Sequence, residues 1–213
     1  MSAAAKPAVD ALKVEGLSIA FGGVKAIQDL SFEVHAGTVH AIIGPNGAGK
    51  TTLINLVTGI YRPTAGRIAL FGSDVDGTPP EQLARRGLSR TFQNLQVCMN
   101  MSAVDNVMIG AHLSLGTGLL RGMFRPPALR RADADCRARA LELMDFVGVG
   151  AHAKAQASQL SYGALKRLEI ARALAASPRL LLMDEPAAGL NHTETAQICL
   201  LYTSDAADEG LGV

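Results

Sequence analysis

The segment Gly44–Thr51 (GPNGAGKT) constrains the fold of this chain more than any other, because it matches the pattern G-x-x-x-x-G-K-[ST]. The residues Val39–Ile43 before it are almost wholly apolar and predict a strand buried on both faces of a sheet. The residues Lys50–Thr58 after it have helical apolar spacing. A buried strand, a glycine-rich turn and a helix therefore predict an α/β fold with a phosphate-binding loop.

The chemistry of phosphate binding explains this spacing. Glycines let backbone N–H groups turn inward around a phosphate, and the following helix adds its positive N-terminal dipole. Lys50 is a compact cation for the β- and γ-phosphates, and the hydroxyl of Thr51 can bind Mg²⁺. An ordinary glycine-rich turn with an accidental lysine is the alternative, and the flanking elements disfavour it. The expected nucleotide-binding residues of this segment are Gly44, Pro45, Asn46, Gly47, Ala48, Gly49, Lys50, Thr51 and Thr52.

A second apolar run, Leu180–Met183, predicts a buried strand that ends in two acids. In enzymes with a phosphate loop of this kind, such a strand lies beside the loop. Asp184 is then expected to support Mg²⁺, and Glu185 is expected to polarise the attacking water. A pair of solvated acids at a strand end is the alternative, which the presence of the phosphate loop disfavours.

The remaining patterns predict an α/β core interrupted by a helical subdomain at about residues 94–175. Period-two alternation and turn residues predict further strands, and helical spacing predicts three further helices. The strands are expected at Leu12–Ile19, Leu30–Val34, Gly66–Phe71 and Leu88–Phe92, and the helices at Pro80–Arg86, Leu129–Val147 and Ser161–Ala176.

Composition narrows the function classes. The 213 residues fit one domain, and 20 basic residues nearly balance 19 acidic ones, which gives no bulk positive charge for nucleic acid. The three cysteines, Cys98, Cys136 and Cys199, are scattered and favour a reduced cytosolic setting. No run reaches the roughly 18–20 apolar residues of a membrane span. We therefore expect any membrane role to act through a partner.

The segment Leu160–Leu174 (LSYGALKRLEIARAL) resembles the ABC signature, whose common form is LSGGQ followed by a basic helix. Ser161 and Gly163, the positions most tied to nucleotide contact, are kept, whereas Tyr162 replaces the first glycine and Ala164 the glutamine. Other motifs of this family follow the expected order. Phe21 stands where an aromatic residue stacks on adenine, and Gln93 in RTFQN matches the Q-loop, which senses Mg²⁺ and the membrane partner. The segment AAGLN at 187–191 matches the D-loop.

This resemblance implies a P-loop NTPase fold of the ABC ATPase type, a mixed sheet flanked by helices with an inserted helical subdomain. It also implies an ATPase that uses ATP and Mg²⁺, with Glu185 and Gln93 as catalytic residues and with Thr51, Gln93 and Asp184 at the metal. Two such cassettes face head to tail, so Ser161 and Gly163 are expected to bind ATP held by a second subunit.

A finer resemblance is to the ATPase subunits of branched-chain amino acid importers. The forms RTFQN, LSYG…RLEIARAL and DEPAAGLN carry it, as does the insert GLLRGMFRPPALRRAD. It implies two transmembrane permease subunits, a second cassette (homo- or heterodimer), indirectly a periplasmic binding protein, and a place at the cytoplasmic face of the bacterial inner membrane. Alternatives are a cassette for another substrate such as urea or a lipid, a soluble ABC ATPase of translation or DNA repair, and a non-enzymatic fragment.

The last residues depart from the family pattern. After the D-loop the family continues with a helix, a strand and a switch histidine, whereas this chain reads ICLLYTSDAADEGLGV. Residues 199–209 resemble one reading frame of a sequencing-library adapter. We therefore expect a cassette over residues 1–198 that is incomplete at its C-terminus, a non-native tail over 199–213, and impaired hydrolysis by this chain. A natural divergent C-terminus is the alternative.

Overall fold

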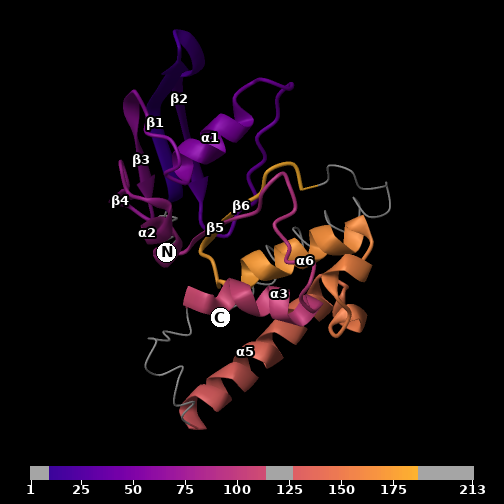
Figure 1. Ribbon diagram of the computed structural model, residues 1–213. Coiled ribbons are helices and arrows are strands. Elements are labelled where there is room, and N and C mark those ends of the chain that lie inside the picture. Colours follow the sequence, from indigo (N-terminus) through magenta and orange to yellow (C-terminus); the bar gives the residue numbers. More distant parts are fainter. Residues whose placement is uncertain (1–9, 114–126, 187–213) are drawn as a thin grey trace, which may run out of the picture. The chain divides into compact units, whose positions relative to one another are not determined.

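The computed structural model describes residues 10–113 and 127–186, apart from the side chains of residues 127–130. These residues belong to two compact units, residues 10–86 and residues 87–186. Figure 1 shows the elements of each unit. Every helix in the described ranges is too short or too polar to cross a lipid bilayer.

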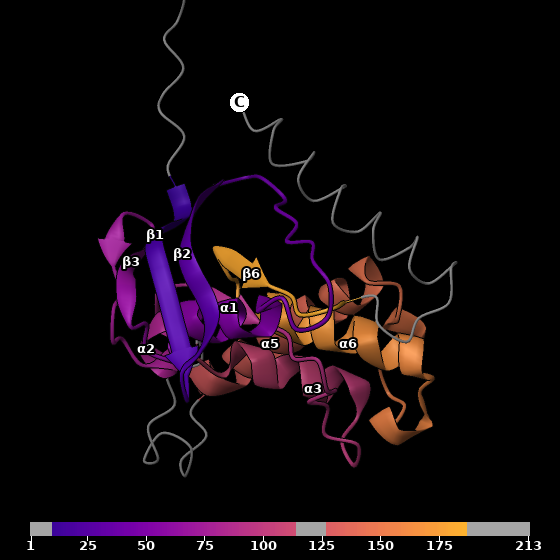
Figure 2. The same ribbon diagram turned by 90° about the horizontal axis from the view of Figure 1, so that it is seen from above.

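The first unit is built on a four-stranded antiparallel sheet in the order β2-β1-β3-β4. The long strands β1 and β2 form a hairpin closed by Gly22 and Gly23, which have positive φ angles of 53° and 86°. Figure 2 shows these two strands side by side. The elements of this unit are β1 (Asp10–Phe21), β2 (Val24–His35), α1 (Lys50–Val57), β3 (Ala65–Leu70), β4 (Ser73–Asp74) and α2 (Pro80–Arg85).

A bulge at Gly16 keeps one face of β1 apolar along its whole length. Leu12 and Val14 are buried before the bulge, and Leu17 and Ile19 are buried after it, so the alternation shifts by one residue at Gly16. The pairing with both neighbouring strands also shifts there. Gly16 has a φ of 59°, which a glycine adopts without a Cβ penalty. The bulge therefore turns a sequence with a broken alternation into one continuous core face.

Helix α1 covers part of this core with one apolar face. Its residues Leu53, Leu56 and Val57 are each at most 4% exposed. The helix contacts β2 and begins at Lys50, directly after the glycine-rich loop. The core of the first unit therefore fixes the position of that loop through the helix that follows it.

The prediction of a buried strand at Val39–Ile43 is wrong. This segment has no regular secondary structure, and Val39, Ile42 and Ile43 are 63%, 47% and 93% exposed. A parallel strand forms only where neighbouring strands complete its hydrogen-bond ladder. Within the described residues, β1 to β4 pair with one another and β5 pairs with β6, and none of these ladders includes residues 39–43. The apolar composition indicated burial but could not supply the partner strands.

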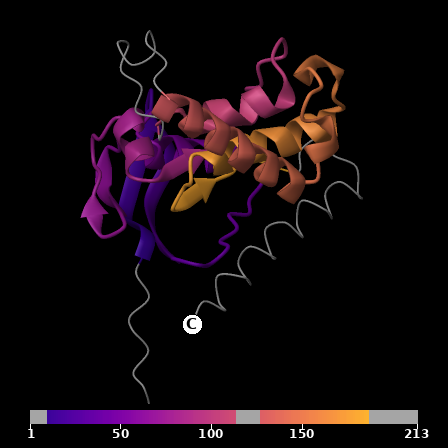
Figure 3. The same ribbon diagram turned by 90° about the horizontal axis from the view of Figure 1, so that it is seen from below.

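The second unit combines a short parallel sheet with a cluster of helices. The strands β5 (Leu88–Arg90) and β6 (Leu180–Leu182) pair in register over three residues. Helices α3 (Ala103–Gly110), α5 (Pro127–Phe146) and α6 (Tyr162–Ala175) contact one another, as Figure 3 shows. Their shared core includes Val104, Val107, Met144 and Leu168, whose exposed fraction is 0%. Three short 3-10 helices complete the unit, at Ala111–Leu113, Gly150–His152 and Ala157–Gln159.

The other expected elements are confirmed with small changes at their ends. The two strands expected within residues 12–34 extend to β1 and β2, and the strand expected at Leu88–Phe92 is shortened to β5. The helices expected at Leu129–Val147 and Ser161–Ala176 are α5 and α6. The strand expected at Leu180–Met183 is β6, but its residues are half-buried rather than buried. The D-loop match at 187–191 and the tail at 199–213 lie outside the described residues.

Candidate nucleotide-binding and hydrolysis site

The glycine-rich loop of the first unit turns at Asn46 and Gly47 and leads directly into α1. The Ala48 N–H donates to the Pro45 carbonyl at 3.2 Å, and the Leu53 N–H donates to the Gly49 carbonyl at 2.8 Å as the helix begins. Helix α1 has no side-chain cap at its N-terminus. Its first N–H groups therefore carry the partial positive charge that favours an anion at this end.

Gly49 is required by two separate features of the loop. Its φ of 87° lies in the left-handed region, which disfavours residues with a Cβ. A Cβ at this position would also lie 2.8 Å from the Ala26 carbonyl oxygen and 3.3 Å from Ile27 Cγ1. The end of the loop is thus packed closely against β2. This contact places the loop beside the β1–β2 hairpin.

The Lys50 side chain turns back over the loop. Its ammonium group donates to the Gly44 carbonyl at 2.8 Å and to the Pro45 carbonyl at 2.9 Å. These contacts hold a positive charge above the backbone of the loop, where a phosphate group can be bound. Thr51 is exposed and Thr52 half-buried on the first turn of α1. The predicted residues Gly44–Thr52 are therefore together in one continuous segment.

Phe21 ends β1 at the hairpin turn and is 44% exposed. Its ring makes an edge-to-face contact with Tyr61, with ring centroids 5.2 Å apart and an angle of 67° between the planes. An exposed aromatic ring held in this way is suited to stack on a flat base. Sequence reasoning missed Tyr61, although an aromatic residue shortly after the loop helix was a usable signal.

In the second unit, the two acids that follow β6 have different surroundings. Asp184 is 3% exposed, and its Oδ2 lies 3.7 Å from Arg90 Nη2. Burial lowers the pKa of the Arg90 guanidinium, and the charge of Asp184 partly offsets this. Glu185 is exposed and has a φ of 48°, an uncommon conformation for a residue with a long side chain. Such backbone strain is frequent at functional sites.

The structure brings Gln93 together with Glu185, although 92 positions separate them in the sequence. The Gln93 side-chain amide donates to Glu185 Oε2 at 3.5 Å, which is a long hydrogen bond. Asp184 is the neighbour of Glu185 in the chain. Two of the residues expected at the metal, Gln93 and Asp184, therefore lie in one region of the second unit, whereas Thr51 belongs to the first.

The chemistry of this donor set fits Mg²⁺. A threonine hydroxyl, a glutamine amide and a carboxylate all offer the hard oxygen ligands that this ion prefers. No cluster of three His, Cys, Asp or Glu side chains suited to a metal occurs within residues 10–113 and 127–186. Gln93 and Asp184 of the second unit offer two such oxygen ligands, and Mg²⁺ commonly completes its coordination with water and phosphate oxygens.

The residues of the signature-like segment begin α6. Ser161 is the N-cap, and its hydroxyl accepts a hydrogen bond from the Ala164 N–H at 3.3 Å. Gly163 is buried in the first turn, while Ser161 and Tyr162 are exposed. The N-terminal end of α6 therefore exposes the small polar residue Ser161 and the ring of Tyr162, while Gly163 packs inside the first turn.

Three charged or amide residues that contact the backbone of residues 92–98 were not predicted from the sequence: Lys166, Glu169 and Asn106, all of them buried. A lysine and a glutamate three positions apart on α6 were an available signal, because such residues can form an ion pair and are rarely fully buried unless they are paired.

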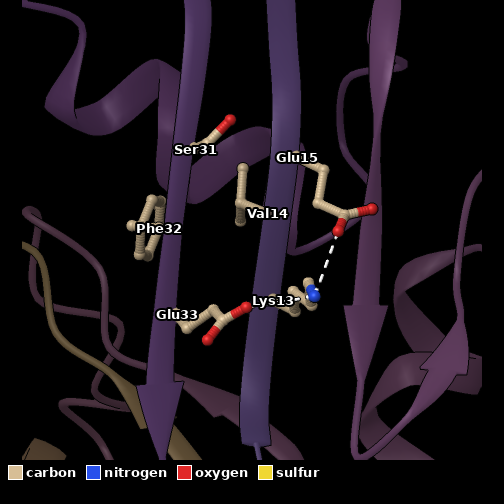
Figure 4. A pocket seen from close by; sticks show the side chains of 6 residues that line it. All are labelled: Lys13, Val14, Glu15, Ser31, Phe32 and Glu33. Carbon is tan, nitrogen blue, oxygen red and sulfur yellow. Dashed lines mark ion pairs between the residues drawn. The ribbon is translucent and has the colours of Figure 1, made fainter.

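Figure 4 shows a separate depression along the β1–β2 ladder, with a volume of about 560 Å³. Lys13 is one of its lining residues, with its ammonium group 3.1 Å from Glu15 and 3.0 Å from Glu33. Val14, Ser31 and Phe32 complete its lining. These charges satisfy one another, and none of the residues expected to bind nucleotide lines the depression.

Residues 27–188 match the ABC transporter family. The high-affinity branched-chain amino acid transport ATP-binding protein LivG of Salmonella typhimurium is 43% identical over 88% of this chain and 73% of its own length. BraF of Pseudomonas aeruginosa, which carries the same description, is 44% identical over 95% of this chain and 79% of its own length.

Solved structures give the same picture of the fold. The ADP conformation of MJ1267, an ATP-binding cassette of an ABC transporter, has a TM-score of 0.78 and 31% identity, covering 93% of this chain and 78% of that chain. The structure of cbiO1 from Clostridium perfringens, part of the ABC transporter complex cbiONQ, has a TM-score of 0.78 and 27% identity, covering 93% and 74%. The α/β fold of ATP-binding cassettes, expected from the sequence, is thereby confirmed.

Proposed function

We propose, given that the chain belongs to the ABC transporter family, that it is the ATP-binding subunit of an importer of branched-chain amino acids. ATP binding and hydrolysis are the activity of its family. The similarity to LivG and BraF, at 43% and 44% identity, supports the substrate class. In this function the chain holds ATP, while membrane subunits carry the amino acid.

The observation that carries the hydrolytic part of this proposal is the contact between Gln93 and Glu185. The Gln93 amide lies 3.5 Å from the Glu185 carboxylate, directly after the buried Asp184. Glu185 accepts a proton from the attacking water, and the Gln93 amide orients the carboxylate for that step. Thr51, Gln93 and Asp184 are the residues that would hold Mg²⁺, which would supply charge neutralisation at the phosphates.

The phosphate loop and the hairpin divide the binding of ATP between them. The backbone of Gly44–Gly49 and the Lys50 ammonium group bind the phosphates, and Thr51 and Thr52 extend this contact onto α1. Phe21 stacks on the adenine ring, held at a fixed angle by Tyr61. Ser161 and Gly163 bind the γ-phosphate of the ATP that a second cassette holds.

The partners and the location follow from this assignment. Two cassettes, identical or different, dimerise around two ATP molecules and dock on two transmembrane permease subunits. A periplasmic binding protein delivers the amino acid on the other side of the membrane. The cassette therefore works at the cytoplasmic face of the bacterial inner membrane. We also keep, as predictions, the helical subdomain at about residues 94–175, the cassette domain over 1–198 and the non-native tail over 199–213.

Transport by the assembled complex tests the function. The chain is coexpressed with two candidate permeases and a candidate second cassette, chosen from genes that neighbour its own, and the complex is reconstituted in vesicles with ATP. We expect ATP-dependent uptake of labelled leucine, isoleucine and valine. Lys50→Ala serves as the matched inactive control, because it removes the ammonium group from the phosphates.

The outcomes separate the alternatives. Uptake of urea or a lipid in place of the amino acids would contradict the substrate class but keep the transport function. ATP hydrolysis without any neighbouring permease genes would instead indicate a soluble ABC ATPase. If neither the wild-type protein nor Lys50→Ala binds ATP, the proposed nucleotide site itself is wrong.

A further inference from the structure

Residues 91–98, here called the Q-loop segment, have little regular secondary structure, yet their backbone is held at several points. The Thr91 N–H donates to the Leu182 carbonyl of β6 at 2.9 Å. At the other end, the Asn106 side chain of α3 accepts from the Cys98 N–H at 2.8 Å and donates to the Cys98 carbonyl at 3.0 Å. Both ends of the segment are therefore anchored to regular elements.

Between these ends, the anchors come from α6. The Phe92 N–H donates to Glu169 Oε1 at 3.4 Å, and Lys166 Nζ donates to the Gln93 carbonyl at 3.1 Å. One turn further along the helix, Arg172 donates to the Gln96 carbonyl. These contacts act on the backbone on both sides of the Gln93 side chain, the group that reaches Glu185.

Lys166 and Glu169 are unusual because they are charged and buried. Their side chains are 4% and 3% exposed, with Nζ and Oε2 3.8 Å apart. Burial raises the pKa of the Glu169 carboxyl, and the Phe92 N–H and Lys166 oppose that rise. A packed hydrophobic pair would serve the core at least as well as a buried ion pair. What apolar residues cannot supply is a donor for the Gln93 carbonyl and an acceptor for the Phe92 N–H.

We infer that Lys166 and Glu169 are positioning residues, which fix the backbone of the Q-loop segment so that the Gln93 amide meets Glu185. This inference rests on the proposed function. The N-cap of the same helix is Ser161, about 7.5 Å along the axis from Lys166 at 1.5 Å per residue. A shift of the N-terminal end of α6 therefore also moves Lys166 and Glu169, which hold the backbone around Gln93. The Lys166 ammonium group also lies 5.9 Å from the centre of the Tyr162 ring, so it contacts the first turn of α6 as well as the Gln93 carbonyl.

Paired apolar replacement separates positioning from folding. The double variant Lys166→Met with Glu169→Leu removes both charges together, so neither is left buried and alone. We expect this variant to fold, with kcat for ATP lowered about tenfold and KM for ATP within about twofold of wild type, because a misplaced group affects the chemical step. The matched variant Lys166→Met with Glu169→Gln keeps an acceptor for the Phe92 N–H and should recover part of the loss.

Two further measurements identify the route of the effect. In a Gln93→Ala background, the double variant should lower kcat by less than about twofold further, because residues that act as a unit are not additive. Hydrogen exchange of the amides at 92–98 should become faster in the double variant, while exchange at 44–58 stays unchanged. Arg139→Ala, which removes an exposed cation of α5 paired with Glu142, is the control and should change neither quantity.

The inference is wrong if the double variant keeps the wild-type kcat, or if its loss is the same with Gln93→Ala present. Unchanged exchange at 92–98 would also overturn it, and this measurement does not depend on activity. A wild-type transporter that does not hydrolyse ATP would contradict the proposed function instead, which keeps the two failures distinguishable.

Discussion

The two regions that carry the predicted site residues are built in different ways. In the first unit, Gly44–Thr52 is one continuous segment whose contacts are mostly with its own backbone, such as those of Lys50 with the Gly44 and Pro45 carbonyls. In the second unit, Gln93, Glu185 and Lys166 come from three distant segments and meet only in the folded chain. A binding loop can therefore be read from a short motif, whereas the hydrolytic region depends on contacts that no motif contains.

The largest expected effect tests the second region. Glu185→Gln keeps the size of the side chain but removes the base, so kcat for ATP should fall about 10²- to 10⁴-fold. ATP binding should persist, with the dimer of cassettes trapped closed. The rate of phosphate release by the assembled transporter measures this effect. Glu142→Gln, at an exposed position of α5, is the control. Hydrolysis at the normal rate would show that the role given to Glu185 is wrong.

A smaller effect tests the first region through its close packing. Gly49→Ala should destabilise the protein by about 1–3 kcal/mol from the left-handed backbone. The approach of the new Cβ to the Ala26 carbonyl, at 2.8 Å, should add about 1–3 kcal/mol. Gly47→Ala is the matched control, since Gly47 has a similar φ of 83° but no atom within 4 Å of its Cβ position. Urea unfolding measures both, and equal losses would refute the role of the close approach.

The smallest effect is a pH dependence of stability that arises from Glu169. Its pKa in the folded protein is raised, chiefly by burial, so the folded state binds a proton more tightly than the unfolded chain. Its contribution is fully present below the unfolded pKa and is lost as pH rises through the folded pKa. The groups that face it are the Phe92 and Gln96 N–H groups of the Q-loop segment and the cations Lys166 and Arg172 of α6.

Glu169→Gln should remove this loss. Its stability relative to wild type should therefore increase as pH rises from about 4.5, the ordinary range of a glutamate. Urea unfolding of both proteins across that range measures the difference. A difference that stays constant with pH would show that burial does not perturb Glu169.

The same contrast explains what could be predicted from the sequence. The helix after the glycine-rich loop, the α6 helix and the strand before Asp184 follow from local periodicity and were expected with nearly correct ends. Val39–Ile43 was misjudged because its apolar residues say nothing about which strands lie beside it. Arg90 and Glu169 were missed for a similar reason, since their partners lie far away in the sequence.

The short parallel pair of β5 and β6 has a consequence for the order in which the chain folds. It joins residues 88–90 to residues 180–182, so its ladder closes only after nearly all of the described chain has been synthesised. The β1–β2 hairpin, in contrast, has a two-residue turn and can form as soon as it emerges from the ribosome. We expect the nascent chain to form its nucleotide loop well before β6 pairs with β5 and fixes Asp184 and Glu185. ATP can therefore bind a chain that is not yet able to hydrolyse it.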